Sequence, residues 1–434
     1  MAKLNKTHDP ARKSWVADAN RADTDFPIQN LPFGVFRTKA GDKRGGIAIG
    51  DQILDLAAML AQGLFSGAAA EAAKAASGPS LNPLMALGNG HASALRAQVS
   101  DLLLDGANAK ALADKILVPM AEATLELPSA VGSFTDFLCS LHHTRRMSPV
   151  GELPPSFKSL PIAYHSRASS VRVSGSTVRR PNGQFKTPDG ALKFGPEPSQ
   201  DYELELGAFI GGGNALGNPI AIRSAPDYLF GYCLLNDWSA RAIQRWESQP
   251  LGPFLSKSLS TSISPWVVTA EALAPFRTAA HARDTADAPL PYLTDAADQS
   301  HGGIDIDMEI YLQTEKMRSG NAAPARIAKT NFQHCYWTFA QMLTHHASNG
   351  CNLQPGDLFG SGTLSGPTDE SRACLAETTK RGTEPLSLPN GETRAWMQDG
   401  DEVIFRARAS RDGYVAIGFG ECRGRLDPAV AWPS

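Results

Sequence analysis

Two glutamates separated by a single residue, Glu203 and Glu205, lie in a segment that alternates acidic and apolar residues. Asp237 follows further along the chain, at the end of a largely apolar run over residues 228–235. Side chains two residues apart on a strand point to the same side, so the two glutamates can bind one cation together. Asp237 needs a partner, because a lone carboxylate buried at the end of a strand is costly. We therefore expect these three acids to form a metal site.

Asp136 is a candidate fourth ligand, and the resulting set consists of oxygen donors only. Oxygen donors suit Mg²⁺ or Ca²⁺, whereas Zn²⁺ prefers histidine and thiolate ligands. An alternative interpretation is that the alternating acidic strand forms the solvated face of an antiparallel sheet. The apolar surroundings of Asp237 favour the metal site over that alternative.

Further motifs occur along the chain in the same order as in a known family. They lie at residues 30–36, 47–56, 164–167, 201–206, 236–241, 250–258, 264–268, 336–338, 344–353 and 360–363. By these motifs the sequence resembles the fumarylacetoacetate hydrolase (fumarylacetoacetase) family. The resemblance extends over nearly the whole chain.

The resemblance implies an enzyme, a hydrolase acting on carbon–carbon bonds in ketonic substances. Its reaction would be the metal-dependent hydrolysis of a β-diketo acid, 4-fumarylacetoacetate, to fumarate and acetoacetate, the last step of tyrosine and phenylalanine catabolism. Such a reaction needs an activated water and stabilisation of the departing carbanion as an enolate. A magnesium or calcium ion chelated by both diketone oxygens would contribute to the second task.

The resemblance also implies roles for individual residues. His143 would be the catalytic base, with His142 as the fallback, and Glu377 would orient it. Arg241, Gln244 and Lys257 would stabilise the oxyanion and the enolate, and Arg241 and Gln244 would also bind the substrate. The remaining contacts would be those of Tyr164 and Thr363 with the substrate, and those of Asp136, Glu203, Glu205, Asp237, Lys257 and Thr261 at the metal.

Without the resemblance, these residues have ordinary interpretations. A lone histidine is commonly packed or on the surface, since histidine has many roles, and Glu377 would be a surface glutamate. Arg241 and Gln244, three residues apart, would be neighbours on a solvated helix face. A non-catalytic metabolite-binding or scaffolding protein is the corresponding alternative function.

The sequence departs from the family pattern at two positions. Leu138 and Ser248 stand where relatives carry tyrosines that touch the substrate, so recognition of the substrate carboxylate is expected to weaken or change. The arginine expected beyond the catalytic histidine is either Arg145 or Arg146. These departures motivate a second enzymatic alternative, a hydrolase or decarboxylase of another acylpyruvate or β-diketo acid on the same scaffold.

Composition excludes several classes of partner. The formal charge is -3 with 20% charged residues, which is no signature of nucleic-acid binding. The sequence contains no apolar run long enough to predict a membrane span, and residues 1–25 do not resemble a signal peptide. We therefore expect a cytoplasmic protein. The six cysteines include no Cys-x-x-Cys pair, so neither a disulfide framework nor a zinc cluster is indicated.

At 434 residues the chain is long enough for two domains. Residues 1–125 predict a small α+β module, with strands and a Gly45–Gly46 turn before helices at 56–76 and 92–117. Residues 126–434 predict a mostly β, antiparallel domain with strands near 170–173, 203–210, 304–312 and 403–407 and one clear helix at 330–349. The resemblance implies an SH3-like N-terminal barrel, a C-terminal mixed β-sandwich roll that holds the site, and a homodimer.

Overall fold

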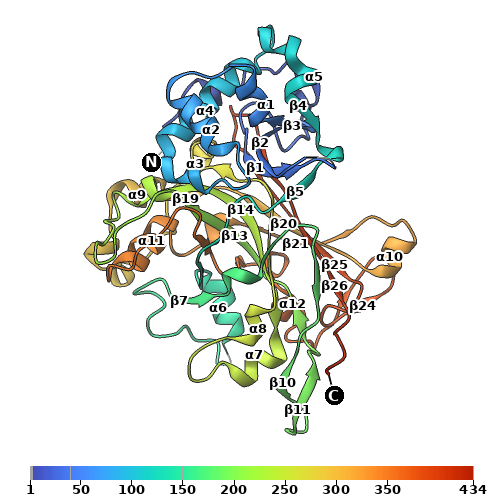
Figure 1. The fold of residues 1–434 in the computed structure, drawn as a ribbon. Coiled ribbons are helices and arrows are strands. Elements are labelled where there is room, and N and C mark those ends of the chain that lie inside the picture. The colour runs from blue at the N-terminus through green and yellow to red at the C-terminus, as the bar shows by residue number, and fades with distance from the viewer. Residues whose placement is uncertain (1–2, 40, 149, 434) are drawn as a thin grey trace.

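The computed structural model describes residues 3–39, 41–148 and 150–433. Figure 1 shows two parts, a smaller N-terminal unit at the top and a larger C-terminal unit below it, from which the β10–β11 hairpin projects. The hairpin consists of β10 (Asn182–Lys186) and β11 (Leu192–Pro196). None of the helices in these ranges combines the length and the apolarity that crossing a membrane requires.

The N-terminal unit is a five-stranded antiparallel sheet with helices packed on it. The strand order is β4-β3-β2-β1-β5. The strands are β1 (Phe33–Arg37), β2 (Arg44–Ile49), β3 (Gln52–Asp55), β4 (Leu117–Pro119) and β5 (Thr124–Glu126). The helices are α1 (Leu56–Ala61), α2 (Gly67–Ala76), α3 (Asn82–Leu87), α4 (Asn89–Leu102) and α5 (Ala113–Ile116).

Two local predictions for this unit are corrected. Gly45 and Gly46 form no turn but lie inside β2. Position 45 is a glycine because a Cβ there would collide with the carbonyl oxygen of Ala76 at the end of α2. The helix expected at 56–76 is two helices, separated at Gly63, whose φ of 66° ends the first one. A positive φ of this kind is the usual role of glycine just beyond a helix.

The C-terminal unit is built on an eight-stranded mixed sheet. The strand order is β7-β6-β22-β13-β14-β16-β8, and β17 also pairs with β14. Its strands are β6 (Phe134–Phe137), β7 (Ala163–Ser166), β8 (Val171–Val173), β13 (Leu204–Ile210), β14 (Leu229–Asp237), β16 (Thr261–Ile263), β17 (Val268–Thr269) and β22 (Leu358–Gly360). The pairs β22–β6 and β16–β8 are parallel, so the expectation of an antiparallel assembly is only partly correct.

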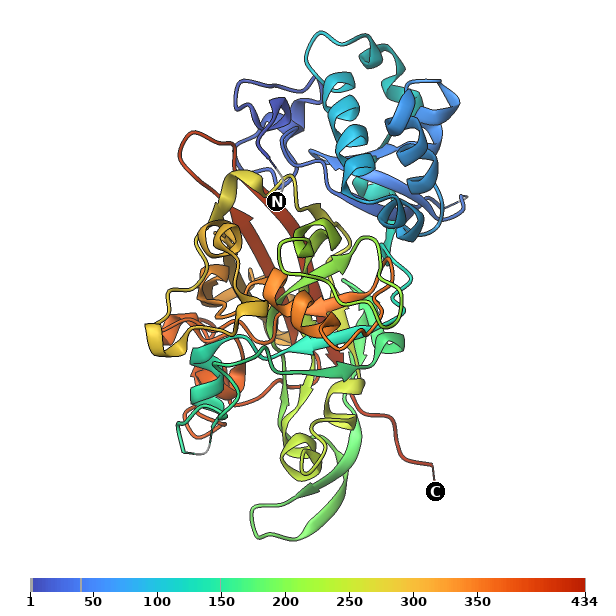
Figure 2. The ribbon, with the colours of Figure 1, turned by 90° about the vertical axis from the view of Figure 1, so that its left-hand side faces the viewer.

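A second, five-stranded sheet packs on one face of the first, with the order β21-β20-β25-β26-β9. It contains β9 (Thr177–Arg179), β20 (Asp307–Gln313), β21 (Ala325–Asn331), β25 (Glu402–Ala409) and β26 (Ile417–Asp427). Leu206 and Tyr232 of the first sheet share a buried core with Met308 and Phe405 of the second. In Figure 1 β25 and β26 lie to the right of the central strands β13 and β14, and in Figure 2 these red strands run behind the orange helix near the centre.

The other face of the first sheet is covered by the N-terminal unit. Phe209 and Phe230 lie in one buried core with Phe33 and Ile47, and the backbones of Phe33 and Val267 exchange two hydrogen bonds of 3.1 and 2.7 Å. β13 and β14 are therefore buried on both faces, which explains why every residue of both strands is buried.

Short helices carry much of the remaining chain. They are α6 (Leu141–Met147), α7 (Arg241–Glu247), α8 (Leu255–Ser258), α9 (Ala296–His301), α10 (Glu315–Ser319), α11 (Phe339–Ala347) and α12 (Leu375–Thr378). The helix predicted at 330–349 is shorter and begins at Phe339, because Thr338 caps it by accepting from the Gln341 backbone. The preceding residues finish β21 and form a single turn at Phe332–His334.

Candidate active site

Four carboxylates from neighbouring strands converge in the C-terminal unit. Asp136 lies on β6 and Glu205 on β13, Glu203 directly precedes β13, and Asp237 ends β14. One oxygen atom from each lies within 4.8 Å of the others, and all four residues are buried. We call these four residues the carboxylate cluster. The structure thus brings together all four acids for which the sequence predicts a common site.

The cluster contains acceptors that no protein donor satisfies. Among the described residues, Asp136 Oδ1 and Glu205 Oε1 are buried without a hydrogen-bond partner. Burial raises the pKa of Asp136 well above its usual value, and the neighbouring Asp237 raises it further. Burial and Asp136 do the same to the pKa of Glu205. A buried acid of this kind requires a compensating charge, and an all-oxygen set fits a hard divalent cation.

Gly360 keeps the space beside the cluster open. A Cβ at this position would lie 2.6 Å from Asp136 Oδ1 and 2.7 Å from Glu205 Oε2. β22, which carries Gly360, pairs with both β6 and β13, so the glycine is fixed between two of the acids. The next turn also contributes, since the Gly362 N–H donates to Glu205 Oε2 at 3.0 Å.

Two cations balance part of the negative charge. Lys257 Nζ contacts Glu203 Oε2 and lies 2.9 Å from Asp237 Oδ2, and Arg241 lies 2.8 Å from Glu203 Oε1. Burial alone would raise the pKa of Glu203, but Lys257 and Arg241 hold it below its usual value. Lys257 was expected among the metal ligands. Its charged ammonium has no lone pair, so it lies at the cluster as an ion-pair partner.

The other residues expected near the substrate or the metal surround the same cluster. Tyr164 donates its hydroxyl to Asp237 Oδ2 at 2.9 Å, and Thr261 donates to Asp237 Oδ1 at 3.1 Å. Gln244 accepts from Arg241 at 3.1 Å. Thr363 is buried in the turn that follows β22. Burial and Asp237 raise the pKa of Tyr164 well above its usual value, which keeps its hydroxyl a donor.

A histidine–glutamate pair lies on α6 and α12. His143 is buried, and its Nδ1 lies 2.6 Å from Glu377 Oε1. Glu377 also accepts from Ser365 Oγ at 2.6 Å through the same oxygen and from Arg146 at 3.0 Å through its other oxygen. Burial raises the pKa of Glu377, but His143, Ser365 and Arg146 together lower it to about 2.

The structure distinguishes the alternatives that the sequence left open around this pair. His142 does not contact Glu377, and its ring instead lies 6.1 Å from that of His334. Arg145 is exposed, whereas Arg146 binds Glu377 and the carbonyl oxygen of Pro367. Arg146 therefore contacts Glu377, the residue that binds His143.

Sequence reasoning missed the roles of Asp201 and Ser365. Asp201 is fully buried, accepts from the Leu375 and Ala376 N–H groups at 2.8 and 3.1 Å, and binds Arg241 Nε at 2.9 Å. It therefore joins the start of α7 to the start of α12. The available signal was its position, since it has the same strand parity as Glu203 and Glu205.

The two positions that depart from the family pattern lie at the edge of the site. Leu138 is half-buried and follows β6, where its N–H donates to the Ile162 carbonyl at 2.8 Å. Ser248 donates its hydroxyl to the Gln244 carbonyl at 2.6 Å, so this hydroxyl is already engaged within the end of α7.

Comparisons with known proteins identify close relatives over almost the full length. Residues 29–128 match the family described as fumarylacetoacetase N-terminal, and residues 133–427 match fumarylacetoacetate (FAA) hydrolase C-terminal. The fumarylacetoacetase of Oryza sativa is 44% identical over 419 residues, which cover 93% of this chain and 95% of that one. The fumarylacetoacetase of Homo sapiens is 44% identical over 422 residues, covering 94% of this chain and 97% of the human one.

A solved structure shows the same fold at lower sequence identity. The fumarylacetoacetate hydrolase of the psychrophile Exiguobacterium antarcticum has a TM-score of 0.51 and 16% identity, and the match covers 92% of this chain and 99% of that one.

Proposed function

The chain belongs to the fumarylacetoacetate hydrolase family, and we propose that the carboxylate cluster and the His143–Glu377 pair form its active site. The chain is a hydrolase of carbon–carbon bonds, and its function is that of a fumarylacetoacetase, in tyrosine and phenylalanine catabolism. Sequence identity to fumarylacetoacetases over nearly the whole chain favours this substrate over other acylpyruvates. The observation that carries the proposal is the buried pair at 2.6 Å in the same unit as four converging acids.

His143 acts as the general base. Its Nδ1 is bound to Glu377, which leaves Nε2 to accept a proton from water. The water oxygen then forms a bond to the fumaryl carbonyl carbon, and the bond to the neighbouring methylene carbon breaks. The electron pair of the broken bond stays with the acetoacetate fragment, which leaves as an enolate. The methylene carbon of this enolate then takes up a proton, which balances the proton that His143 removed from water.

Positive groups stabilise the charge that develops in this step. Lys257 and Arg241 are held in place by buried carboxylates, so their donors need no rearrangement when the oxyanion forms. We infer that Gln244, Tyr164 and Thr363 position the substrate beside them. When bound, a Mg²⁺ or Ca²⁺ ion supplies Lewis-acid polarisation of the diketone oxygens. Asp136, Glu203, Glu205 and Asp237 would hold this ion, with the Thr261 hydroxyl beside Asp237.

The test is the loss of diketone absorbance when fumarylacetoacetate is added to the purified protein. We expect rapid loss, its abolition by EDTA, and its recovery with Mg²⁺ or Ca²⁺, whichever ion the cavity prefers. His143→Ala should bind substrate without turning it over. Rapid turnover of a shorter diketo acid combined with none of fumarylacetoacetate would reject the proposed substrate, and metal-independent turnover would reject the role of the cluster.

Several wider features are proposed on the family resemblance alone. We propose a homodimer, a cytoplasmic location and an SH3-like arrangement of the five-stranded N-terminal sheet. We also propose a domain boundary near residues 125 and 126. The end of β5 at Glu126 and the start of β6 at Phe134 support a boundary in this region.

A further inference from the structure

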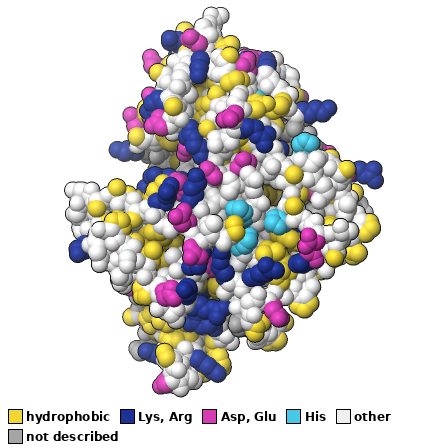
Figure 3. Space-filling view, turned by 180° about the vertical axis from the view of Figure 1, so that it is seen from behind, with side chains coloured by type: hydrophobic (Ala, Val, Ile, Leu, Met, Phe, Trp, Pro, Cys, Tyr) yellow, Lys and Arg dark blue, Asp and Glu magenta, His cyan; other side chains and the backbone are white. Residues whose placement is uncertain are grey.

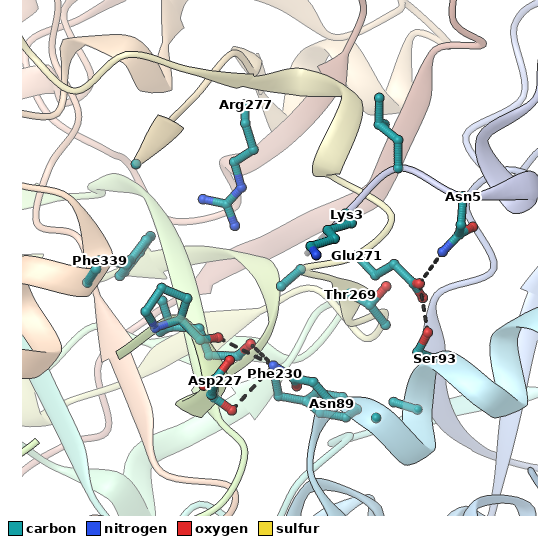
Figure 4. Close-up of a pocket in the computed structure, with 18 of the residues that line it drawn as sticks. Lys3, Asn5, Asn89, Ser93, Asp227, Phe230, Thr269, Glu271, Arg277 and Phe339 are labelled. Atoms are coloured by element: carbon teal, nitrogen blue, oxygen red, sulfur yellow. Dashed lines mark hydrogen bonds between the residues drawn. The ribbon is translucent and has the colours of Figure 1, made fainter. Parts of the chain in front are cut away.

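A cavity lies at the boundary between the two units. Its volume is about 360 Å³, which is within the range of small-molecule sites. It is lined by the N-terminal segment at Lys3, by Asn89 at the start of α4, and by Phe230, Arg277 and Phe339 of the C-terminal unit. Figure 4 shows these side chains around a common open space. We call it the boundary cavity.

The boundary cavity is separate from the carboxylate cluster. Phe230 lies near the beginning of β14, whereas Asp237 ends this strand. A strand rises about 3.3 Å per residue, so seven residues correspond to roughly 23 Å between the cavity wall and the acid. The residues that line the cavity include none of the cluster and neither member of the His143–Glu377 pair. A molecule in this cavity would not contact the proposed active site.

Arg277 presents unmatched donors to the cavity. Its guanidinium donates one hydrogen bond of 3.1 Å to the Tyr232 hydroxyl and lies 5.7 Å from the centre of that ring. Within the described ranges it is in no ion pair, and the nearest acid in electrostatic terms is Asp298, whose pKa burial raises and Arg277 lowers. A guanidinium has five N–H donors, so most of them remain available. Lys3 of the N-terminal segment extends toward the same space (Figure 4).

Three acids also line the cavity, and two of them have hydrogen-bond partners of their own. Glu271 accepts from Asn5 at 2.5 Å and from Ser93 at 2.7 Å, and it lies 3.6 Å from Arg96. Asp298 is buried and accepts from the Thr338 hydroxyl at 2.9 Å. Asp227 is exposed. Of the charged groups that line the cavity, Glu271 and Asp298 are engaged in these contacts, whereas Arg277, Lys3 and the exposed Asp227 are in no ion pair with another described residue.

We propose that the boundary cavity binds a small organic carboxylate with an apolar body. Arg277 would hold the carboxylate through paired N–H donors, which match the geometry of two carboxylate oxygens, and Lys3 would add a second positive charge. The rings of Phe230 and Phe339 and the methyl groups of Ala270 and Ala340 would contact the apolar part. Because the ligand would touch both units, its binding would stabilise the arrangement of the two.

Benzoate is the probe and benzylamine is its cationic counterpart of similar size. Binding is measured by isothermal titration on the full chain in EDTA, together with the thermal unfolding midpoint. We expect saturable binding of benzoate, a rise in Tm, and no comparable effect of benzylamine. Arg277→Gln should weaken benzoate binding about ten-fold or more, since hydrogen bonds to charged groups contribute on that scale.

Controls separate this cavity from the active site and from general charge effects. Arg326 is exposed on β21 and its ion pair with Glu309 is on the surface, so Arg326→Gln should leave benzoate binding unchanged. Turnover of fumarylacetoacetate without benzoate should be unchanged in Arg277→Gln. The proposal is overturned if benzoate does not bind at millimolar concentration, if Arg277→Gln binds it as well as the original chain, or if benzylamine binds equally well.

Discussion

Replacing Glu377 with glutamine tests the central pair directly. Glutamine has nearly the same volume, so the buried position between α6 and α12 stays filled while the negative charge is lost. The side chain would still reach His143, but its NH2 group would replace one of the two oxygens and face either Arg146 or the pair His143 and Ser365, which now donate to those oxygens. The variant therefore removes the charge and disturbs the orientation of the imidazole without creating a cavity.

The structure gives a magnitude for the effect. The surroundings lower the pKa of Glu377 from 4.5 to about 2, which corresponds to roughly 3 kcal/mol in favour of the carboxylate. His143 is the first of the groups that lower this pKa, and Ser365 and Arg146 add to it, so the negative charge of Glu377 lies directly beside the proposed base. Its loss should lower kcat about 100-fold, at about 1.4 kcal/mol for each factor of ten.

The assay is steady-state turnover of fumarylacetoacetate for the original chain and for Glu377→Gln. We expect kcat to fall and KM to change little, since Glu377 holds the base and does not bind substrate. Glu384 is exposed, and within the part of the chain that the structure describes its ion-pair partner is Lys380, so Glu384→Gln is the matched control with unchanged kcat. A kcat within three-fold of the original for a folded Glu377→Gln protein would refute the reasoning.

The same carboxylate predicts a pH dependence of stability. The pKa of Glu377 is lower in the folded protein, so its contribution is present above the unfolded value and is lost as the pH falls. In denaturant titrations, the stability difference between the original chain and Glu377→Gln should be constant near neutrality. It should shrink as the pH falls from 4.5 toward about 2. A difference that grows on acidification would contradict the assignment.

Three further predictions concern the surroundings of the site. Arg146→Ala should lower kcat about ten-fold, because it loses one charge-assisted hydrogen bond to Glu377. Arg145→Ala is the control and should leave kcat unchanged. Equal kcat values for the two variants would place Arg146 outside the mechanism. Gly360→Ala should weaken Mg²⁺ binding measured by calorimetry, because its Cβ would lie 2.6 Å from Asp136 Oδ1; unchanged affinity would show that the metal lies elsewhere. Tyr164→Phe removes the donor to Asp237 Oδ2 and should raise KM several-fold in the turnover assay; an unchanged KM would exclude it from substrate binding.

The sequence predicted the carboxylate cluster because its signals are local. Glu203 and Glu205 have the same strand parity, which also fits a solvated strand face, and the apolar run that Asp237 ends is what favours a shared buried site. The comparisons confirm the family that the motifs indicated. The roles of the individual site residues remain predictions that the assays above will test.

Other features depended on packing that the sequence does not display. Gly45 and Gly46 resemble a turn, yet a Cβ on Gly45 would collide with the end of α2 and one on Gly46 with the side chains of Ile53 and Phe36. Spacing could not distinguish Arg145 from Arg146, since the difference is which of them reaches Glu377 across more than two hundred residues of chain. The boundary cavity likewise brings Lys3 and Arg277 together through the docking of two units.

Asp201 has a consequence for how mutational data on this protein should be analysed. One buried carboxylate anchors both Arg241, which we propose to stabilise the oxyanion, and the backbone at the start of α12, which carries Glu377. The positions of Arg241 and of Glu377 therefore both depend on Asp201. Substitutions at Arg241 and at Glu377 are expected to be non-additive, and a double-mutant cycle would give a substantial coupling energy between side chains that do not touch. Asp201→Asn would uncouple them and impair both together.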